Sequence, residues 1–575
     1  MTFTVGHYLG ERFKQIGLKK HFAVAGDYNL ILLDQLIESC GAESQIYSCN
    51  ELNCSFSAEG YAREHGIAAA VVTFSVGAIS AMNGIGSAYA ENVPVILVSG
   101  APNTNDLGSD HILHHTIGTT NYQYQQEMLK HITCATEHIV SAQSAPERID
   151  RVIRAALCER KPVYLEIACN VSAQPCARPG PLSQLLTPPS VDEKSMHKAI
   201  EASLHFIEQR KKIVILVGGK VRSAHAIEQT VALADALGCA VAVMGQAKSF
   251  FPETHPGFRG IYWGEISSPS TQALVEDADG VIALGPVWND YSSVGWRALV
   301  RGKRVIEVQA EHTQVGETVY SGFGLRDCIK ALIPKVPKRT ETCQNKYTPY
   351  NVVAATDPDS ALTNDEMCRQ INALIDGRTT LFAETGDSWF NALRMQLPKG
   401  AKVETEMQWG HIGWSIPAVH GAALAAPDRR HIVMVGDGSF QFTAQEVSQM
   451  IRMKLPIIIF LINNRGYVIE IKIHDGPYNY IQNWNYAGLM EVFNGKKSDS
   501  QDIHSKDFGH HGLGLKAHTG AELAAAIEKA KAHTQGPTLI ECVIEREDCT
   551  DLLVRWGKAV AQTNARKPQP QYPTL

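Results

Sequence analysis

Short apolar runs, each of strand length, recur along the whole chain. They lie at 21–27, 68–74, 93–100, 212–219, 280–286, 380–388, 431–438 and 455–464. Runs of this kind are typical of strands buried on both faces of a parallel sheet. Between them, apolar residues recur at helical spacing, as they do at Val5, Leu9, Phe13 and Ile16. The alternation of strands and helices predicts an α/β fold built of doubly wound parallel sheets.

Two Pro-rich or polar stretches, 172–195 and 338–361, interrupt this alternation. Neither has sustained apolar periodicity, and we interpret both as linkers. A chain of 575 residues is too long for a single hydrophobic core. We therefore predict three doubly wound parallel-sheet domains and a tail, at 1–185, 195–340, 360–560 and 561–575.

Composition and charge argue against two classes of partner. The chain has 44% hydrophobic and 19% charged residues, as ordinary soluble globular proteins have, and a net charge of −6. No basic run is present that would hold a nucleic-acid backbone. The longest apolar run, 455–462, is far too short to cross a membrane. We expect neither a nucleic-acid nor a membrane partner.

The cysteines and the N-terminus bear on the compartment. The 13 cysteines are scattered without a zinc-type pairing, which favours reduced thiols over disulfides. The first residues lack the charged and apolar regions of a signal peptide. We expect a cytoplasmic protein. A polar, aperiodic segment at 493–514 predicts a mobile loop.

The stretch IVMVGDGSFQ places Asp437 between two glycines directly after an apolar strand. The next apolar run ends in Asn463 and Asn464, and a right-handed βαβ crossover would bring the two strand ends to one edge of the sheet. A carboxylate oxygen of Asp437, an amide oxygen of Asn464 and the backbone carbonyl of Gly466 would then form an incomplete shell of hard ligands. Such a shell suits Mg²⁺, which takes its remaining ligands from phosphate and water.

The same motif suits a diphosphate. Gly436 and Gly438 let the backbone approach it, and a helix that begins after Ser439 favours its negative charge. Gly-Asp-Gly alone would indicate only a turn. The second apolar strand ending in Asn-Asn favours the metal and phosphate site.

At these residues the chain resembles a known family. The segment GDGSFQFTAQEVSQMIRMKLPIIIFLINNRGY is similar to the thiamine-diphosphate signature, in which GDG is followed by a helix, a strand and NN. Further segments extend the likeness over nearly the whole chain: HFAVAGDYNL, NELNCSFSAEGYAR, HHTIG, AETGDSWFN, EMQWGHIGWS and GYVIEIKIHDGPYNYI. Together they resemble the thiamine-diphosphate-dependent decarboxylases, in particular the bacterial pyruvate decarboxylases.

The resemblance implies three α/β domains: a first that binds the aminopyrimidine, a middle one without cofactor, and a third that binds the diphosphate and Mg²⁺. It also implies a homotetramer, a dimer of dimers, with active sites at the dimer interface. Glu51 occupies the position of the family's activating glutamate. A carboxylate bonded to the pyrimidine ring favours the imino tautomer, whose exocyclic nitrogen can take the proton from the thiazolium C2.

Four further titratable residues match the family's reacting centre: Asp27, His114 and His115 in the first domain and Glu470 in the third. Two carboxyls and two imidazoles can exchange protons near neutral pH, and their proximity would shift their pKa values. Sequence does not assign individual transfers. Metal ligation by the histidine pair is not expected, because no third ligand is spaced with it.

The remaining matches concern the cofactor and the substrate pocket. Ile412 matches the bulky residue that wedges between the cofactor's two rings, the carbonyl of Gly410 matches a contact to the pyrimidine amino group, and Thr385 resembles a residue beside the cofactor. Residues that match pocket positions restricting the substrate to a small side chain are Trp389 and Ile469, with Tyr291 as a weaker match. Arg465 lies inside the metal motif, and we expect its side chain to point away from the metal.

These residues predict non-oxidative decarboxylation of a 2-oxo acid, with pyruvate as the leading substrate and acetaldehyde and CO₂ as products. The alternatives are a decarboxylase of larger acids such as indolepyruvate or phenylpyruvate, a carboligase joining two pyruvates, and a non-catalytic assembly subunit. A dinucleotide-binding dehydrogenase is not favoured, because GIGSAY at 84–89 lacks the third glycine and no strand leads tightly into it.

Overall fold

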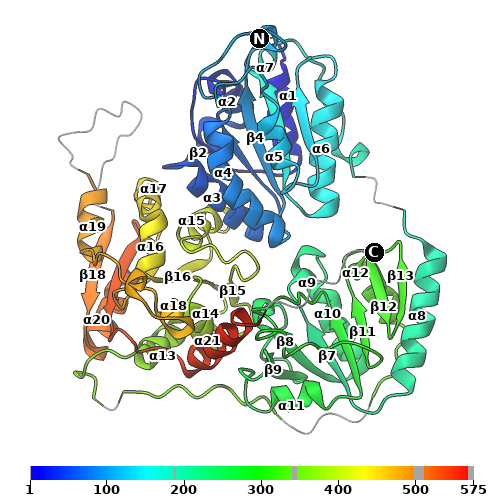
Figure 1. The fold of residues 1–575 in the computed structure, drawn as a ribbon, viewed down its shortest axis with the longest axis vertical. Coiled ribbons are helices and arrows are strands. Elements are labelled where there is room, and N and C mark those ends of the chain that lie inside the picture. The colour runs from blue at the N-terminus through cyan, green and yellow to red at the C-terminus, as the bar shows by residue number, and fades with distance from the viewer. Residues whose placement is uncertain (1, 187–189, 340–345, 356, 496–510, 568–575) are drawn as a thin grey trace.

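Each third of the chain builds its own sheet. The computed structural model describes residues 2–186, 190–339, 346–355, 357–495 and 511–567 (Figure 1). The three sheets consist mainly of parallel strands with helices on their faces, which confirms the predicted α/β class. In Figure 1 the N-terminal domain lies above the middle domain, drawn in green, and the C-terminal domain, drawn in yellow to red.

The N-terminal domain has a wholly parallel sheet in the order β2-β1-β3-β4-β6-β5. Its strands are β1 His21–Ala23, β2 Gln45–Tyr47, β3 Ala68–Val72, β4 Val95–Ala101, β5 Thr136–Ile139 and β6 Val163–Ala168. Its helices are α1 Val5–Gln15, α2 Leu30–Cys40, α3 Glu51–His65, α4 Val76–Ala90, α5 Tyr124–Leu129, α6 Ala145–Glu159 and α7 Cys169–Ser172. The strands β3, β4 and β6 are buried at every position, and the apolar runs at 68–74 and 93–100 predict this for the first two.

The middle domain has the strand order β13-β12-β11-β10-β7-β8-β9, in which β12 pairs antiparallel with both β11 and the edge strand β13. Its strands are β7 Ile213–Val217, β8 Ala240–Met244, β9 Phe258–Tyr262, β10 Gly280–Leu284, β11 Val305–Val308, β12 His312–Val315 and β13 Thr318–Ser321. Its helices are α8 Glu193–Glu208, α9 Lys220–Ser223, α10 Ile227–Leu237, α11 Thr271–Glu276 and α12 Leu325–Leu332.

The C-terminal domain repeats the parallel architecture in the order β15-β14-β16-β17-β19-β18. Its strands are β14 Thr379–Ala383, β15 Lys402–Glu404, β16 Arg430–Gly436, β17 Ile458–Asn463, β18 Leu513–Ala517 and β19 Thr538–Val543. Its helices are α13 Asn364–Leu374, α14 Asp387–Arg394, α15 Ser415–Ala425, α16 Asp437–Thr443, α17 Val447–Arg452, α18 Val468–Ile473, α19 Tyr486–Phe493, α20 Gly520–Ala532 and α21 Asp551–Asn564.

The N- and C-terminal domains are joined by close packing of α3 against α15. A Cβ atom on Gly60 would lie 1.9 Å from the carbonyl oxygen of Ala418, and one on Gly421 would lie 1.8 Å from that of Ser57. Only glycine permits this approach of two helix backbones. The contact holds the N- and C-terminal domains of one chain in a fixed relation.

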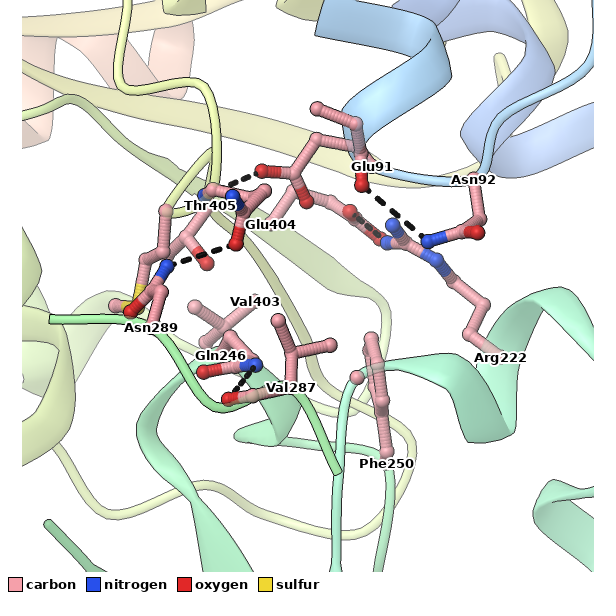
Figure 2. Close-up of a pocket in the computed structure, with 14 residues that line it drawn as sticks. Glu91, Asn92, Arg222, Gln246, Phe250, Val287, Asn289, Val403, Glu404 and Thr405 are labelled. Carbon is pink, nitrogen blue, oxygen red and sulfur yellow. Dashed lines mark hydrogen bonds and ion pairs between the residues drawn. The ribbon is translucent and has the colours of Figure 1, made fainter. Parts of the chain in front are cut away.

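All three domains meet around a buried ion network. The guanidinium of Arg63 in α3 contacts Glu59 at 2.7 Å and Glu404 at 3.0 Å, and Glu404 also pairs with Arg222 of the middle domain. Figure 2 shows the small pocket beside this network, about 30 Å³ in volume, at the carboxyl edge of the middle sheet. There Glu91 accepts a hydrogen bond from the backbone N–H of Gln408 at 2.8 Å.

Several sequence-based expectations differ from the structure in detail. The helix of the GDG motif begins at Asp437 itself rather than after Ser439, and a 3-10 turn at 444–446 interrupts it. The GIGSAY segment lies inside α4, where no dinucleotide turn can form. Most of the predicted loop at 493–514 lies outside the described residues, and β18 begins at Leu513.

Two further expectations concern membrane-spanning helices and the state of the cysteines. Within the part of the chain that the structure describes, no helix has the length and apolar composition needed to cross a membrane. The cysteines in the same ranges are free thiols.

Candidate active site

Two neighbouring parallel strands of the C-terminal sheet bring the GDG and Asn-Asn motifs together. In the β16–β17 pair, Gly436 lies opposite Ile462. Asp437 follows the end of β16, and Asn464 follows the end of β17. Both residues therefore lie at the carboxyl edge of the sheet, where open α/β sheets bind their ligands.

Three oxygen atoms converge at this edge. The side-chain oxygen of Asn464 faces only acceptors, and a rotated amide would place its nitrogen 2.9 Å from the Gly466 carbonyl oxygen and 3.2 Å from Oδ1 of Asp437. With the oxygen facing inward, as the structure has it, these atoms would repel each other unless a cation lay among them. Octahedral ligands at about 2.1 Å from Mg²⁺ are separated by about 3 Å, so the spacing fits a small divalent ion.

Backbone groups hold the Asp437 carboxylate in place. Its Oδ2 accepts from the N–H of Arg465 at 2.6 Å, and its Oδ1 accepts from the N–H of Gly438 at 2.8 Å. Burial raises the pKa of Asp437 to about 6, and the backbone hydrogen bonds oppose that shift. The Arg465 side chain is half exposed and reaches towards Glu545 at 4.0 Å, so it points away from the three oxygens.

A cavity of about 300 Å³ opens beside these oxygens, at the lower end of the range for small-molecule sites. It is lined by Thr385, Gly386, Asp387, Ser388, Ile412, Gly436, Gly438, Ser439, Phe442, Ile462, Asn464, Gly466, Tyr467, Val468, Ile469 and Glu470. At Gly386 and Gly436 the space that a Cβ atom would fill is open. A ligand can therefore approach both backbones directly, as a diphosphate requires.

Polar and apolar groups on the cavity wall suit a bound cofactor. The buried hydroxyl of Thr385 has no hydrogen-bond partner among the described residues, so it is available to a bound group. Ile412 projects from the segment between β15 and α15. Gly410, two residues earlier, has a φ of 71°, which favours glycine, but it does not line the cavity. The wall residues therefore fit the group that the sequence implies.

The predicted substrate residues of this domain do not all reach the cavity. Glu470 and Ile469 in α18 line it, and burial raises the pKa of Glu470. Trp389 is fully buried behind the wall, with its ring 6.4 Å from that of Tyr291. Neither aromatic lines the cavity, so the structure does not place either at the predicted substrate position.

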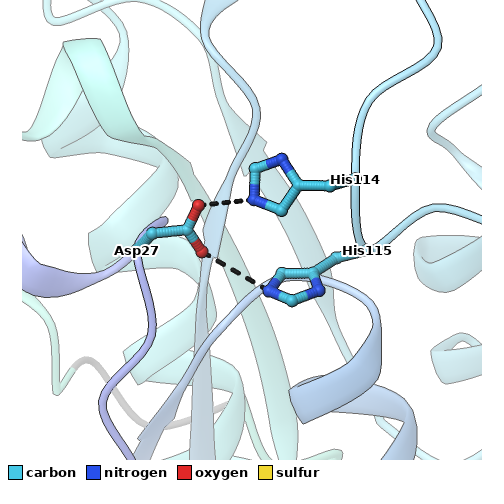
Figure 3. A group of neighbouring side chains, drawn as sticks. All are labelled: Asp27, His114 and His115. Carbon is cyan, nitrogen blue, oxygen red and sulfur yellow. Dashed lines mark hydrogen bonds and ion pairs between the residues drawn. The ribbon is translucent and has the colours of Figure 1, made fainter.

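The N-terminal domain gathers Asp27 and the histidine pair (Figure 3). The Nε2 of His114 lies 2.5 Å from Oδ2 of Asp27, and the Nε2 of His115 lies 3.5 Å from Oδ1. No third metal ligand is spaced with the two histidines in the sequence. Asp27 supplies one from 87 residues earlier, and the three ligand-type atoms lie within 4.8 Å of one another. The direct contacts suit exchange of protons between carboxylate and imidazole.

Glu51 is the first residue of α3, next to the turn that begins α4. A Cβ atom on Gly77 would lie 3.2 Å from Oε1 of Glu51, so the carboxylate rests against that glycine. Like Asp27, this side chain is partly open to solvent.

The two groups of residues are separate within one chain. Every described residue that lines the cavity lies between 385 and 470 in the C-terminal domain. Glu51, Asp27, His114 and His115 belong to the N-terminal domain and are not among them. One chain therefore presents two half-sites.

Comparison with known proteins agrees with this three-domain arrangement. The N-terminal TPP-binding domain of thiamine pyrophosphate enzymes matches residues 3–132, the central domain matches 200–336, and the C-terminal TPP-binding domain matches 385–542. A probable pyruvate decarboxylase, Pdc101, of Schizosaccharomyces pombe is 52% identical over 99% of this chain and 98% of its own. A pyruvate decarboxylase of Neurospora crassa is 49% identical over 99% and 98%, and pyruvate decarboxylase 4 of Arabidopsis thaliana is 40% identical over 99% and 93%.

The chain belongs to the thiamine-pyrophosphate-dependent pyruvate decarboxylase family. Its cofactor is thiamine pyrophosphate, also called thiamine diphosphate. These relatives come from fungi and a plant, and the expected likeness to the bacterial enzymes in particular stays a prediction.

Glu384 supports the cavity wall of this member of the pyruvate decarboxylase family, and the sequence patterns did not predict it. It follows β14 directly and is fully buried. Its carboxylate accepts from the N–H of Thr385 at 2.8 Å and from the N–H and hydroxyl of Ser415 at 3.0 and 2.6 Å. Glu384 thus ties Thr385 to α15, which follows Ile412. A charged residue at the end of an apolar strand was the available signal, but its partner is 31 residues away.

We expect Glu384→Gln to flatten the pH dependence of stability. Burial raises the pKa of Glu384 to about 7, whereas the unfolded chain releases this proton near the ordinary value of 4.5. The folded state binds more protons between these values, so its free energy of unfolding decreases as pH rises through that range. In the glutamine variant the free energy of unfolding should decrease by about 3 kcal/mol less over this pH range than in the wild type. Denaturant unfolding at several pH values measures the difference. The exposed Glu528→Gln should keep the wild-type slope, and an unchanged slope in Glu384→Gln would contradict the assignment.

Proposed function

We propose that this protein catalyses the non-oxidative decarboxylation of pyruvate to acetaldehyde and CO₂, with thiamine diphosphate anchored by Mg²⁺. The observation that supports this best is the convergence of the Asp437, Asn464 and Gly466 oxygens beside a small cavity. The pyruvate decarboxylases at 40–52% identity support the substrate.

We assign the cofactor's diphosphate to the GDG edge and its rings to the cavity. Asp437, Asn464 and the Gly466 carbonyl would hold Mg²⁺, and the open backbones of Gly386 and Gly436 would leave room for the phosphates. Ile412 would support the ring system from one side. Bound thiamine diphosphate supplies the nucleophilic carbon and the electron-accepting ring that make loss of CO₂ possible.

Protein groups would supply the proton transfers. Glu51 is suited to share a proton with the pyrimidine end of the cofactor, because its carboxylate is fixed at the start of α3. Glu470 lines the cavity, and burial raises the pKa of its carboxyl, which suits a group that exchanges protons with a bound substrate. Asp27, His114 and His115 form the second group able to donate and accept protons.

We propose that two copies of the chain complete each active site, within a homotetramer built as a dimer of dimers. The separation of the half-sites in one chain supports a shared site. Exposed apolar side chains surround both halves, which is typical of an interaction surface. They are Leu30, Ile31, Val76, Ile112 and Ile117 on the N-terminal domain and Trp409, Phe442, Tyr478, Tyr480 and Trp484 on the C-terminal domain.

The deciding experiment is acetaldehyde formation from pyruvate with and without thiamine diphosphate and Mg²⁺. We expect release only when both are present. We also expect slower turnover of phenylpyruvate, because a cavity of about 300 Å³ must hold the reacting part of the cofactor as well as the substrate. Faster turnover of phenylpyruvate would favour a decarboxylase of larger acids, and acetoin as the main product would favour a carboligase. Absence of CO₂ from every 2-oxo acid tested would favour a non-catalytic subunit.

A further inference from the structure

Ser75 has an unusual backbone conformation. It connects β3 to α4 with a φ of 55° and a ψ of −82°. This combination belongs to a tight γ-type turn that residues with a side chain rarely adopt. Such conformations persist only where neighbouring groups hold them, and they cluster at functional sites.

The turn at Ser75 touches both parts of the N-terminal half-site. Gly77, two residues on, is the glycine against which Glu51 rests. Thr73, two residues before Ser75, packs against Gly26: a Cβ atom added to Gly26 would lie 2.5 Å from the Cβ atom of Thr73. Gly26 directly precedes Asp27. The conformation of Ser75 therefore sets the backbone beside Glu51 and beside the Asp27 cluster.

Two side chains from the start of α5 hold this turn. Oε1 of Gln125 accepts from the N–H of Ser75 at 2.5 Å, and the hydroxyls of Tyr124 and Ser75 lie 2.7 Å apart. Tyr124, Gln125 and Ser75 are all buried. Because α5 follows the segment that contains His114 and His115, these contacts also join that segment to the turn.

A buried carboxylate fixes the direction of the Gln125 amide. Its nitrogen donates to Oε2 of Glu166 at 3.1 Å and contacts the hydroxyl of Tyr164, which itself donates to Glu166 at 2.7 Å. Glu166 lies in the fully buried strand β6. With the nitrogen held towards Glu166, the amide oxygen must face Ser75, where it accepts the backbone hydrogen bond.

We propose that Tyr124, Gln125 and Glu166 are positioning residues for the reaction: they hold Ser75 in its strained conformation and thereby fix the turn against which Glu51 lies. This inference rests on the proposed function, since Glu51 acts only if the chain uses the cofactor. The three residues touch neither the cavity nor Glu51 in the structure, so their effect passes through the backbone from Ser75 to Gly77.

The test compares Gln125→Met with the matched control Gln123→Met, which alters an exposed glutamine two residues earlier. We expect Gln125→Met to lower kcat roughly 10- to 100-fold, because small displacements of catalytic groups have effects of this size. The KM for pyruvate should change less than about threefold, because the variant leaves the cavity wall intact. In the chain without cofactor, amide hydrogen exchange at 73–79 should become faster in Gln125→Met and stay unchanged in the control.

A second substitution separates positioning from packing. Glycine adopts the conformation of Ser75 without strain, so adding Ser75→Gly to Gln125→Met should restore at least part of the lost kcat. A purely structural role of Gln125 predicts no rescue. If Gln125→Met does not fold, Tyr124→Phe removes only one hydroxyl and should lower kcat about threefold or more.

Two results would overturn the inference. The first is a kcat of Gln125→Met that equals that of the control, or the same result for Tyr124→Phe if that variant is needed. The second is a loss of kcat in Gln125→Met that adding Ser75→Gly leaves unchanged. Failure of the proposed function is seen separately, as absence of decarboxylation by the wild-type chain. In that case the exchange measurement on the cofactor-free chain still decides whether Gln125 holds the turn.

Discussion

Glu51→Gln should lower turnover of pyruvate by roughly 100- to 10,000-fold, the range typical of a lost acid–base group. Glutamine keeps the size of the side chain and its place at the start of α3, but it cannot share a proton with the cofactor. Because the cavity wall and the Asp437 edge lie in the other domain, the affinity for Mg²⁺ and diphosphate should change little. Steady-state kinetics at saturating cofactor, combined with cofactor titration by tryptophan fluorescence, measures both quantities.

The exposed Glu193→Gln in α8 of the middle domain is the matched control for the charge change. It should behave as the wild-type chain does. A Glu51→Gln variant that retains turnover within about threefold of this control would remove Glu51 from the proposed chemistry.

Asp437→Asn should reduce the affinity for Mg²⁺ by more than about 100-fold, since loss of a direct ligand exceeds the effect of losing a supporting contact. The asparagine keeps an oxygen at the edge but removes the charge that holds a divalent cation. Activity should therefore need far more Mg²⁺ and recover in part when the ion is added in excess. A titration of activity with Mg²⁺ at fixed thiamine diphosphate measures this shift.

The pH dependence of the same titration gives an independent check. Burial raises the pKa of Asp437 to about 6, so protons compete with the metal below that pH and the apparent affinity of the wild-type chain should fall there. The asparagine variant should lack this dependence. Asp428→Asn, an exposed change before the other end of β16, should match the wild type. Equal Mg²⁺ requirements in the wild type and Asp437→Asn would contradict the metal site.

Local pattern was enough to predict the meeting of Asp437 with Asn464 and eight of the strands, which are β1, β3, β4, β7, β10, β14, β16 and β17, but not the other strands of the three sheets. Both depend on short-range rules: apolar runs form buried strands, and consecutive parallel strands place their ends at one edge. The pattern placed the start of the GDG helix three residues late, since Gly-Asp-Gly can equally continue a turn.

Residues whose partners are distant in sequence could not be predicted in this way. Gln125 and Glu384 act through buried hydrogen bonds to groups 31 to 50 residues away, and no periodicity marks such pairs. Asp27 and the histidine pair became candidates only through the family resemblance. The structure adds the contacts between them.

The division of the chemistry between two domains of one chain has a genetic consequence. If each complete active site forms between neighbouring copies, a substitution in one half-site and a substitution in the other need not inactivate every active site of a mixed dimer. Mixed dimers of a Glu51 variant and an Asp437 variant would combine both defects in one centre and leave the other intact. Two inactive alleles in the same cell would then complement each other, restoring about a quarter of the normal number of working centres when the copies assort at random.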